Sequence, residues 1–129
     1  MTREDKELLL KDICARLPYE IKVKFYDHWV DEYEIIPLTA KLLSDTVYIG
    51  DIKPYLFPLS SMTDEQKKTL KVLCDWNDEE ADAQSILVLY QKHFVMKTDV
   101  IDWLNENHFD YRDLIEKGLA IDATGLNIY

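Results

Sequence analysis

A chain of 129 residues with 47% apolar residues has the size and composition of one globular domain. Its net charge is −10, from 25 acidic and 15 basic residues, so its surface should repel the phosphates of nucleic acids and of anionic lipids. No apolar run could span a bilayer and no apolar segment follows the first residues. We therefore expect a single cytoplasmic domain over residues 1–129 that binds neither a membrane nor nucleic acid directly.

The first segment predicts a helix. Thr2 is a residue type that caps helix starts, and Pro18 stops the helix at the residue before it. Apolar residues recur four positions apart between these two points, as they do on one face of a helix. These residues are Leu9, Ile13 and Leu17. Cys14 lies beside this face and Cys74 lies in a later apolar run, so we expect both thiols to be buried.

The next three segments read as strands. Residues 21–26 alternate between apolar and polar side chains, which is the pattern of a half-buried strand. Residues 33–43 predict a second strand that Pro37 breaks or bulges, and residues 46–49 are β-branched and aromatic and predict a third. Such short antiparallel strands need a helix on one face to be stable.

Residues 49–66 link this strand-rich half to a helical half. Pro54 and Pro58 each lack a backbone donor, so we expect neither to lie in a central strand. The four large apolar side chains between residues 54 and 59 are too apolar for a free linker, so this segment should pack across both halves. Thr63 followed by Gln66 is a capping box, which predicts the start of a helix.

The second half of the chain predicts helices. The apolar run 86–90 fits a buried helix turn or a buried strand, and its flanking residues favour the helix. Thr98 can cap the next helix, and Asp110 can cap a short last helix that ends at Gly118. The sequence as a whole therefore predicts an α+β fold, in which a small antiparallel sheet of two to four strands packs with three to five helices.

Three blocks of the chain resemble a protein family. They are residues 1–18 (MTREDKELLLKDICARLP), residues 51–63 (DIKPYLFPLSSMT) and residues 102–120, which begin DWLN and continue HFDYRDLIEKGLA. The blocks cover about half of the chain, and they resemble a family of short uncharacterised proteins of gut bacteria and their mobile elements. That family carries no assigned activity, so the resemblance implies no catalytic or binding residues.

Metal and cofactor sites find little support in the sequence. Asp75, Asn77 and Glu79 match the first positions of a calcium loop, but Glu80 stands where that loop needs glycine and Ile86 where it needs glutamate. The chain has no Cys/His spacing typical of zinc and too few glycines for a phosphate-binding loop. We therefore expect no metal and no cofactor.

Catalytic residues are equally hard to find. His108 and Asp110 lie close together in the sequence, but the aspartate is better explained as a helix cap, and no second group stands at a recognisable spacing from the histidine. His93 follows an apolar run and is best explained as a structural histidine. A small hydrolase or metal-dependent enzyme that uses scattered Asp, Glu and His residues remains the alternative.

Protein binding is the function that the composition favours. An acidic surface would attract a partner with a basic surface, and aromatic side chains supply anchors at protein interfaces. Five aromatic residues are candidates for such anchors, although each could instead pack in a small core. They are Trp29, Tyr33, Tyr48, Tyr55 and Trp103. A second alternative is an acidic mimic of nucleic acid that inhibits a DNA-binding protein.

Overall fold

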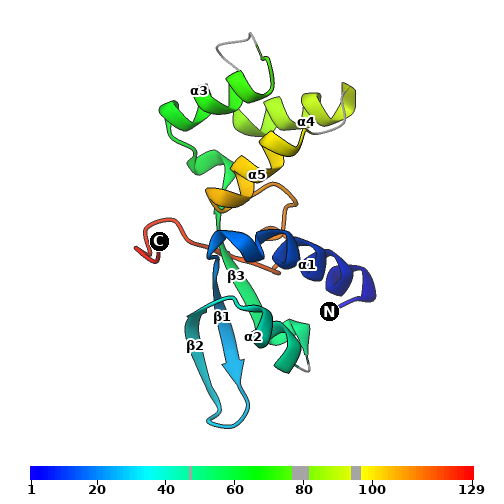
Figure 1. Ribbon diagram of the computed structural model, residues 1–129, viewed down its shortest axis with the longest axis vertical. Coiled ribbons are helices and arrows are strands. Elements are labelled where there is room, and N and C mark those ends of the chain that lie inside the picture. Colours follow the sequence, from blue (N-terminus) through cyan, green and yellow to red (C-terminus); the bar gives the residue numbers. More distant parts are fainter. Residues whose placement is uncertain (47, 77–81, 94–96) are drawn as a thin grey trace.

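The structure, a computed structural model, describes residues 1–46, 48–76, 82–93 and 97–129, with the backbone alone for residues 92 and 93. The molecule is elongated, with a lobe of helices at one end and a β-hairpin at the other (Figure 1). The helices are α1 (Arg3–Arg16), α2 (Ala40–Asp45), α3 (Asp64–Leu73), α4 (Ala83–His93) and α5 (Thr98–Glu106). The strands are β1 (Lys22–Asp27), β2 (Glu32–Pro37), β3 (Ile52–Pro58), β4 (Phe109–Asp110) and β5 (Ile121–Asp122). The predicted α+β class is confirmed.

The strands form one mixed sheet in the order β2-β1-β3-β4, and β5 also pairs with β3. The pairs β1–β2 and β1–β3 are antiparallel, as the sequence predicts. The pairs of β3 with β4 and with β5 are parallel, which the sequence does not predict. Strands β4 and β5 are each two residues long, so neither produces a readable alternation of side chains.

The prediction that neither proline lies in a central strand is wrong, because β3 has neighbours on both edges and ends at Pro58. The pairing with β1 covers Ile52 to Pro54, and the pairing with β5 begins one residue later, at Tyr55. Each neighbour of β3 thus pairs with only two or three residues. Such short pairings leave room for residues without a backbone donor.

Strand β3 passes from one hydrophobic core to the other. Leu56 is fully buried in the first core with Leu9 and Ile13 of α1. The next residue, Phe57, packs against the second core, which also contains Leu104 of α5. The prediction that this segment packs across both halves is therefore confirmed, and β3 runs between the two ends of the molecule in Figure 1.

Two helix starts agree with their predicted caps. The Thr2 hydroxyl accepts the backbone N–H of Asp5, and the Thr63 hydroxyl accepts that of Gln66. The run 86–90 lies in α4, as predicted. Thr98 is the first residue of α5 and not its cap.

Two predictions about α1 and the second strand are wrong. Cys14 is exposed because the buried face of α1 also takes in the polar residues Asp12 and Arg16, which turns the thiol outward; Cys74 is buried as expected. The second strand ends at Pro37, because Thr39 caps α2 by accepting the N–H of Leu42.

Two further segments lack the predicted secondary structure. The third strand expected at residues 46–49 does not form: Thr46 ends α2, residue 47 lies outside the described residues, and the short helical turn η2 (Ile49–Asp51) follows. The expected last helix is a series of turns instead. Its backbone amides at Leu114 and Ile115 bond to the Asp110 carboxylate. Gly118, with φ of +74°, is the predicted left-handed residue.

A buried ion network joins α1 to the segment that holds β4. Arg16 Nε donates to Asp12 Oδ2 over 2.8 Å, and both side chains are fully buried. A second cation, Arg112, donates to Asp12 Oδ1 over 2.8 Å. Arg16 Nη2 also donates to the carbonyl of Phe109 over 2.6 Å. One carboxylate therefore holds two guanidinium groups where the helix meets the sheet.

Candidate functional site

The β1–β2 hairpin presents an ordered turn at the far end of the molecule. Asp27 pairs with Glu32 at the last rung of the hairpin, which leaves residues 28–31 as the turn. Asp27 Oδ1 accepts the backbone N–H of Trp29 over 2.9 Å, an Asx-type contact that fixes the start of the turn. The Trp29 side chain stands at this tip with 97% of its surface exposed.

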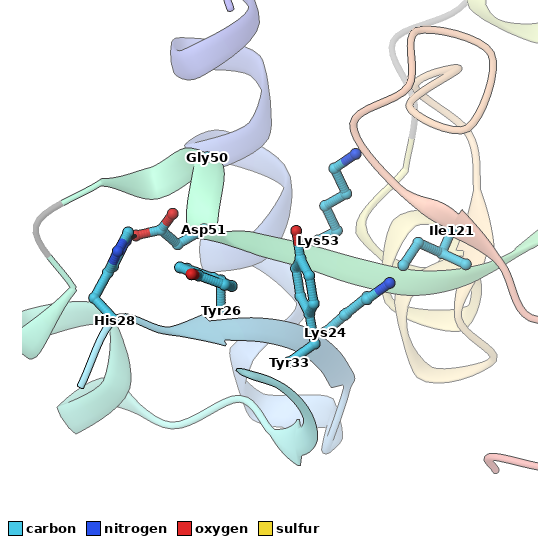
Figure 2. A pocket seen from close by; sticks show the side chains of 8 residues that line it. All are labelled: Lys24, Tyr26, His28, Tyr33, Gly50, Asp51, Lys53 and Ile121. Carbon is cyan, nitrogen blue, oxygen red and sulfur yellow. Dashed lines mark hydrogen bonds and ion pairs between the residues drawn. The ribbon is translucent and has the colours of Figure 1, made fainter. Parts of the chain in front are cut away.

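A histidine–carboxylate contact fixes the hairpin end to the rest of the fold. His28 Nε2 lies 2.7 Å from Asp51 Oδ2, which belongs to η2 (Figure 2). The imidazole ring also lies edge-on to Tyr26, with centroids 4.6 Å apart, and 6.3 Å from the ring of Tyr48. The contact links the hairpin turn to η2, two segments that are distant in sequence. It therefore holds His28 in position beside the rings of Tyr26 and Tyr48.

An acidic groove lies on one side of the His28–Asp51 contact. It encloses about 290 Å³ and combines aromatic rings with three carboxylates. Its lining residues are Phe25, Asp27, His28, Trp29, Asp45, Thr46, Tyr48 and Asp51. Aromatic faces next to carboxylates attract an ammonium or guanidinium group, because both the ring quadrupole and the negative charge favour a cation.

An open-face pocket lies on the other side of the same contact, and its chemistry is different. It encloses about 530 Å³ on the uncovered face of the sheet. Lys24 and Lys53 stand directly opposite each other on β1 and β3, and Lys24 Nζ lies 4.4 Å from the ring centre of Tyr33. The lining residues are Lys24, Tyr26, His28, Tyr33, Gly50, Asp51, Lys53 and Ile121 (Figure 2). The two pockets thus share His28 and Asp51 but differ in charge, because one carries three carboxylates and the other carries two lysines.

The five aromatic residues predicted as anchors divide into two groups. Three of them are exposed: Trp29 and Tyr48 line the acidic groove, and Tyr33 lines the open-face pocket. Tyr48 is 66% exposed and Tyr33 is 65% exposed. Tyr55 is only 5% exposed because it lies in the middle of the central strand, so it is a core residue. Trp103 is half-buried and stacks on Phe109 in the second core, with centroids 5.7 Å apart.

His108 and Asp110 do not act on each other. The Asp110 carboxylate is buried and accepts backbone amides, including that of Leu114, so it fixes a series of turns and does not cap the helix that the sequence predicts there. Burial and the nearby Arg16 charge lower the pKa of His108 to about 4, so the imidazole is neutral at neutral pH. Its Nδ1 is buried and has no hydrogen-bond partner among the residues that the structure describes.

The C-terminal tail covers part of the open sheet face. The Tyr129 ring stacks on His108 with centroids 3.9 Å apart, and its hydroxyl donates to the carbonyl of Tyr55 over 2.7 Å. The same hydroxyl accepts the backbone N–H of Lys22. Burial raises the pKa of Tyr129 to about 12. The tail therefore closes the sheet near β4 and leaves the hairpin end open.

Metal-binding geometry is absent from the part of the chain that the structure describes, where no three His, Cys, Asp or Glu side chains gather to hold an ion. The side chain of His93 and residues 77–81 of the calcium-like loop lie outside the described residues. Among the described helices, none has both the length and the apolar character to cross a membrane.

Sequence reasoning missed two side-chain contacts, the one between His28 and Asp51 and the one between Asp12 and Arg16. His28 and Asp51 are 23 residues apart, so no local spacing announces their contact. Asp12 and Arg16 do stand four apart, and that spacing was a usable signal, but such pairs are usually exposed on helices.

Comparison with known proteins adds no relative. No protein-family model, no curated protein and no solved structure matches this chain. Its function therefore has to be argued from its own residues.

Proposed function

We propose that this protein acts by binding another protein, and that the acidic groove at the hairpin end receives a basic side chain of that partner. The observation that carries the proposal is the almost complete exposure of Trp29 beside Tyr48 in a groove with three carboxylates. Exposed apolar patches with a polar rim mark interaction sites, and Trp and Tyr are enriched at protein interfaces.

The energetics of such a contact favour Trp29 as an anchor. A buried aromatic side chain removes roughly 150–250 Å² from water. At about 25 cal/mol per Å² this corresponds to roughly 4–6 kcal/mol of gross stabilisation, before the cost of association. The Asx-type contact of Asp27 with the Trp29 backbone restricts the loop in advance, so less conformational entropy is lost on binding.

Charge supports a basic partner. The groove carries Asp27, Asp45 and Asp51 on a chain with a net charge of −10. Long-range attraction of this sign speeds encounter with a cationic surface, and a lysine or arginine side chain between the Trp29 and Tyr48 rings would gain a cation–π contact as well.

Affinity capture tests the proposal. The tagged protein, the groove variant Trp29→Ala plus Tyr48→Ala, and the control Val72→Ala should be compared for the proteins they retain from the native host at low salt. Val72 is a suitable control because it is an exposed apolar residue on α3, in the helical lobe. We expect a partner that the wild type and the control retain and that the groove variant loses. Equal retention by all three would contradict the proposal.

A hydrolase is the second candidate, and the His28–Asp51 contact is the observation that favours it. A histidine oriented by a carboxylate is a potential general base, but it needs a nucleophile or an activated water. The lining of the two cavities includes one Ser or Thr hydroxyl, that of Thr46, which donates to the Leu42 carbonyl over 2.5 Å. Turnover that is lost in a folded His28→Ala variant would favour the hydrolase over the binding role.

A further inference from the structure

Strand β2 is an edge of the sheet. Its neighbour is β1, and within the described part of the chain no strand pairs with its outer side. All of its residues except Ile36 are exposed, and Figure 1 shows β2 on the outer side of β1. The outer side of an edge strand carries backbone N–H and C=O groups that can pair with a further strand.

The two faces of β2 differ in chemistry. Tyr33 and Ile35 stand opposite Tyr26 and Lys24, on the face of the open pocket, and Ile35 is 57% exposed. This face of β2 is apolar. It also continues into the open-face pocket, where the Tyr33 ring lies beside Lys24 in Figure 2.

The opposite face of β2 is acidic. Glu34 pairs with Phe25 and Glu32 pairs with Asp27, so both glutamates lie on the face that holds the acidic groove. Neither glutamate forms an ion pair with another described residue. Along β2, apolar and acidic side chains therefore alternate strictly between the two faces from residue 32 to residue 35.

This pattern disfavours a second copy of the chain at the edge. Two β2 strands paired edge to edge would bring Glu32 and Glu34 of one copy against those of the other. Like charges on neighbouring strands are destabilising, and two chains of net charge −10 repel each other in addition. The charges on β2 thus disfavour pairing with the β2 strand of a second copy, but they do not disfavour pairing with a basic strand.

We propose that an extended segment of the partner, in which basic and apolar residues alternate, pairs with the outer edge of β2 as an additional strand. Its basic side chains face Glu32 and Glu34, and its apolar side chains cover Tyr33 and Ile35. This inference rests on the proposed function, because it identifies the type of segment that the acidic groove and its neighbouring edge accept together.

The charges on the two faces of the hairpin set the orientation of the added strand. Lys24 and Lys53 occupy the open face and have no ion-pair partner among the described residues. A shift of the added strand by one residue would place its basic side chains toward these lysines. Attraction to the glutamates and repulsion by the lysines therefore favour the same arrangement, in which the basic side chains of the added strand lie on the face of Glu32 and Glu34.

A pair of synthetic peptides tests the inference. One peptide of about eight residues alternates lysine and valine, and its isomer has the same composition with the lysines in one block. We expect the alternating peptide to bind more tightly than the isomer, and we expect bound peptide to slow hydrogen exchange of backbone amides within Glu32–Pro37. The double variant Glu32→Gln plus Glu34→Gln should weaken binding of the alternating peptide about tenfold. The control Glu106→Gln plus Glu116→Gln removes the same charge from exposed positions elsewhere and should leave affinity nearly unchanged.

Equal affinity for the two peptides, unchanged exchange within β2, or equal weakening by the two double variants would each overturn the inference. The captured partner separates this inference from the proposed function. Loss of that partner in Trp29→Ala together with full retention by the β2 variant would overturn the edge pairing and leave the groove supported. Loss in the β2 variant together with full retention by Trp29→Ala would support the edge and contradict the groove.

Discussion

Substitution of Asp12 by alanine should destabilise the protein by about 3–5 kcal/mol. The carboxylate is fully buried and accepts hydrogen bonds from Arg16 and Arg112. Its removal leaves the buried Arg16 guanidinium, within the described part of the chain, with the Phe109 carbonyl as its remaining hydrogen-bond acceptor and with no counter-charge in contact. Breaking a buried ion pair from one side costs this much because the remaining charge cannot return to water.

The same helix offers a matched control. Arg3 and Glu7 also form an i,i+4 ion pair, at 3.1 Å, but their side chains are 92% and 67% exposed. An exposed pair of this kind contributes only about 0.3–0.5 kcal/mol. Glu7→Ala should therefore change the free energy of unfolding far less than Asp12→Ala, although both variants remove a carboxylate from α1.

Urea denaturation followed by circular dichroism measures both losses, with the slope of each transition checked for constancy. The reasoning is refuted if Asp12→Ala costs less than about 1 kcal/mol, or if the two variants lose the same amount. The double variant Asp12→Leu plus Arg16→Met provides a further check. It should recover part of the lost stability, since apolar residues replace the fully buried Asp12–Arg16 pair, while Arg112, which also loses its carboxylate, has a side chain that is 17% exposed and can reach water.

Three more predictions follow from individual residues. Tyr55→Ala should lower the free energy of unfolding by about 3 kcal/mol, whereas Tyr48→Ala should change it by less than about 0.5 kcal/mol, because only the first ring is buried; chemical denaturation compares them. The free energy of unfolding should fall as the pH drops from 6.5, the ordinary pKa of histidine, toward about 4, the pKa of folded His108. In this range the unfolded chain binds a proton at His108 that the folded chain does not bind. His108→Gln should reduce this pH dependence, as measured by denaturation curves taken across the range. Gly118→Ala should cost about 1 kcal/mol in thermal unfolding, from its φ of +74° alone, because a Cβ there would meet no atom within 4 Å.

Local signals predicted two of the helix starts, those of α1 and α3. The Thr2 and Thr63 caps depend on side-chain contacts three residues away, so the sequence contains all of the necessary information. The α+β class and the first strand followed in the same way from the periodicity of the side chains. Tertiary structure replaced the local pattern at β3, where pairing with three different strands overrode the two prolines.

The candidate site was only partly predictable. Aromatic composition identified Trp29, Tyr33 and Tyr48, but nothing local distinguished these residues from the buried Tyr55. Their exposure depends on the tertiary structure, because a ring on a strand in the middle of the sheet is buried and a ring at the hairpin end is exposed. The carboxylates of the acidic groove come from three separate segments, so their grouping depends on the fold.

The association rate of the captured partner, measured at rising salt for the wild type and for Trp29→Ala, tests the binding role most directly. We expect the wild-type rate to fall at least about tenfold between low and high salt, because attraction between the acidic hairpin end and a basic partner steers their encounter. We also expect Trp29→Ala to keep this salt dependence but to dissociate faster, since the ring acts after encounter. A wild-type rate that does not change with salt, with dissociation unaffected by the loss of Trp29, would contradict the account.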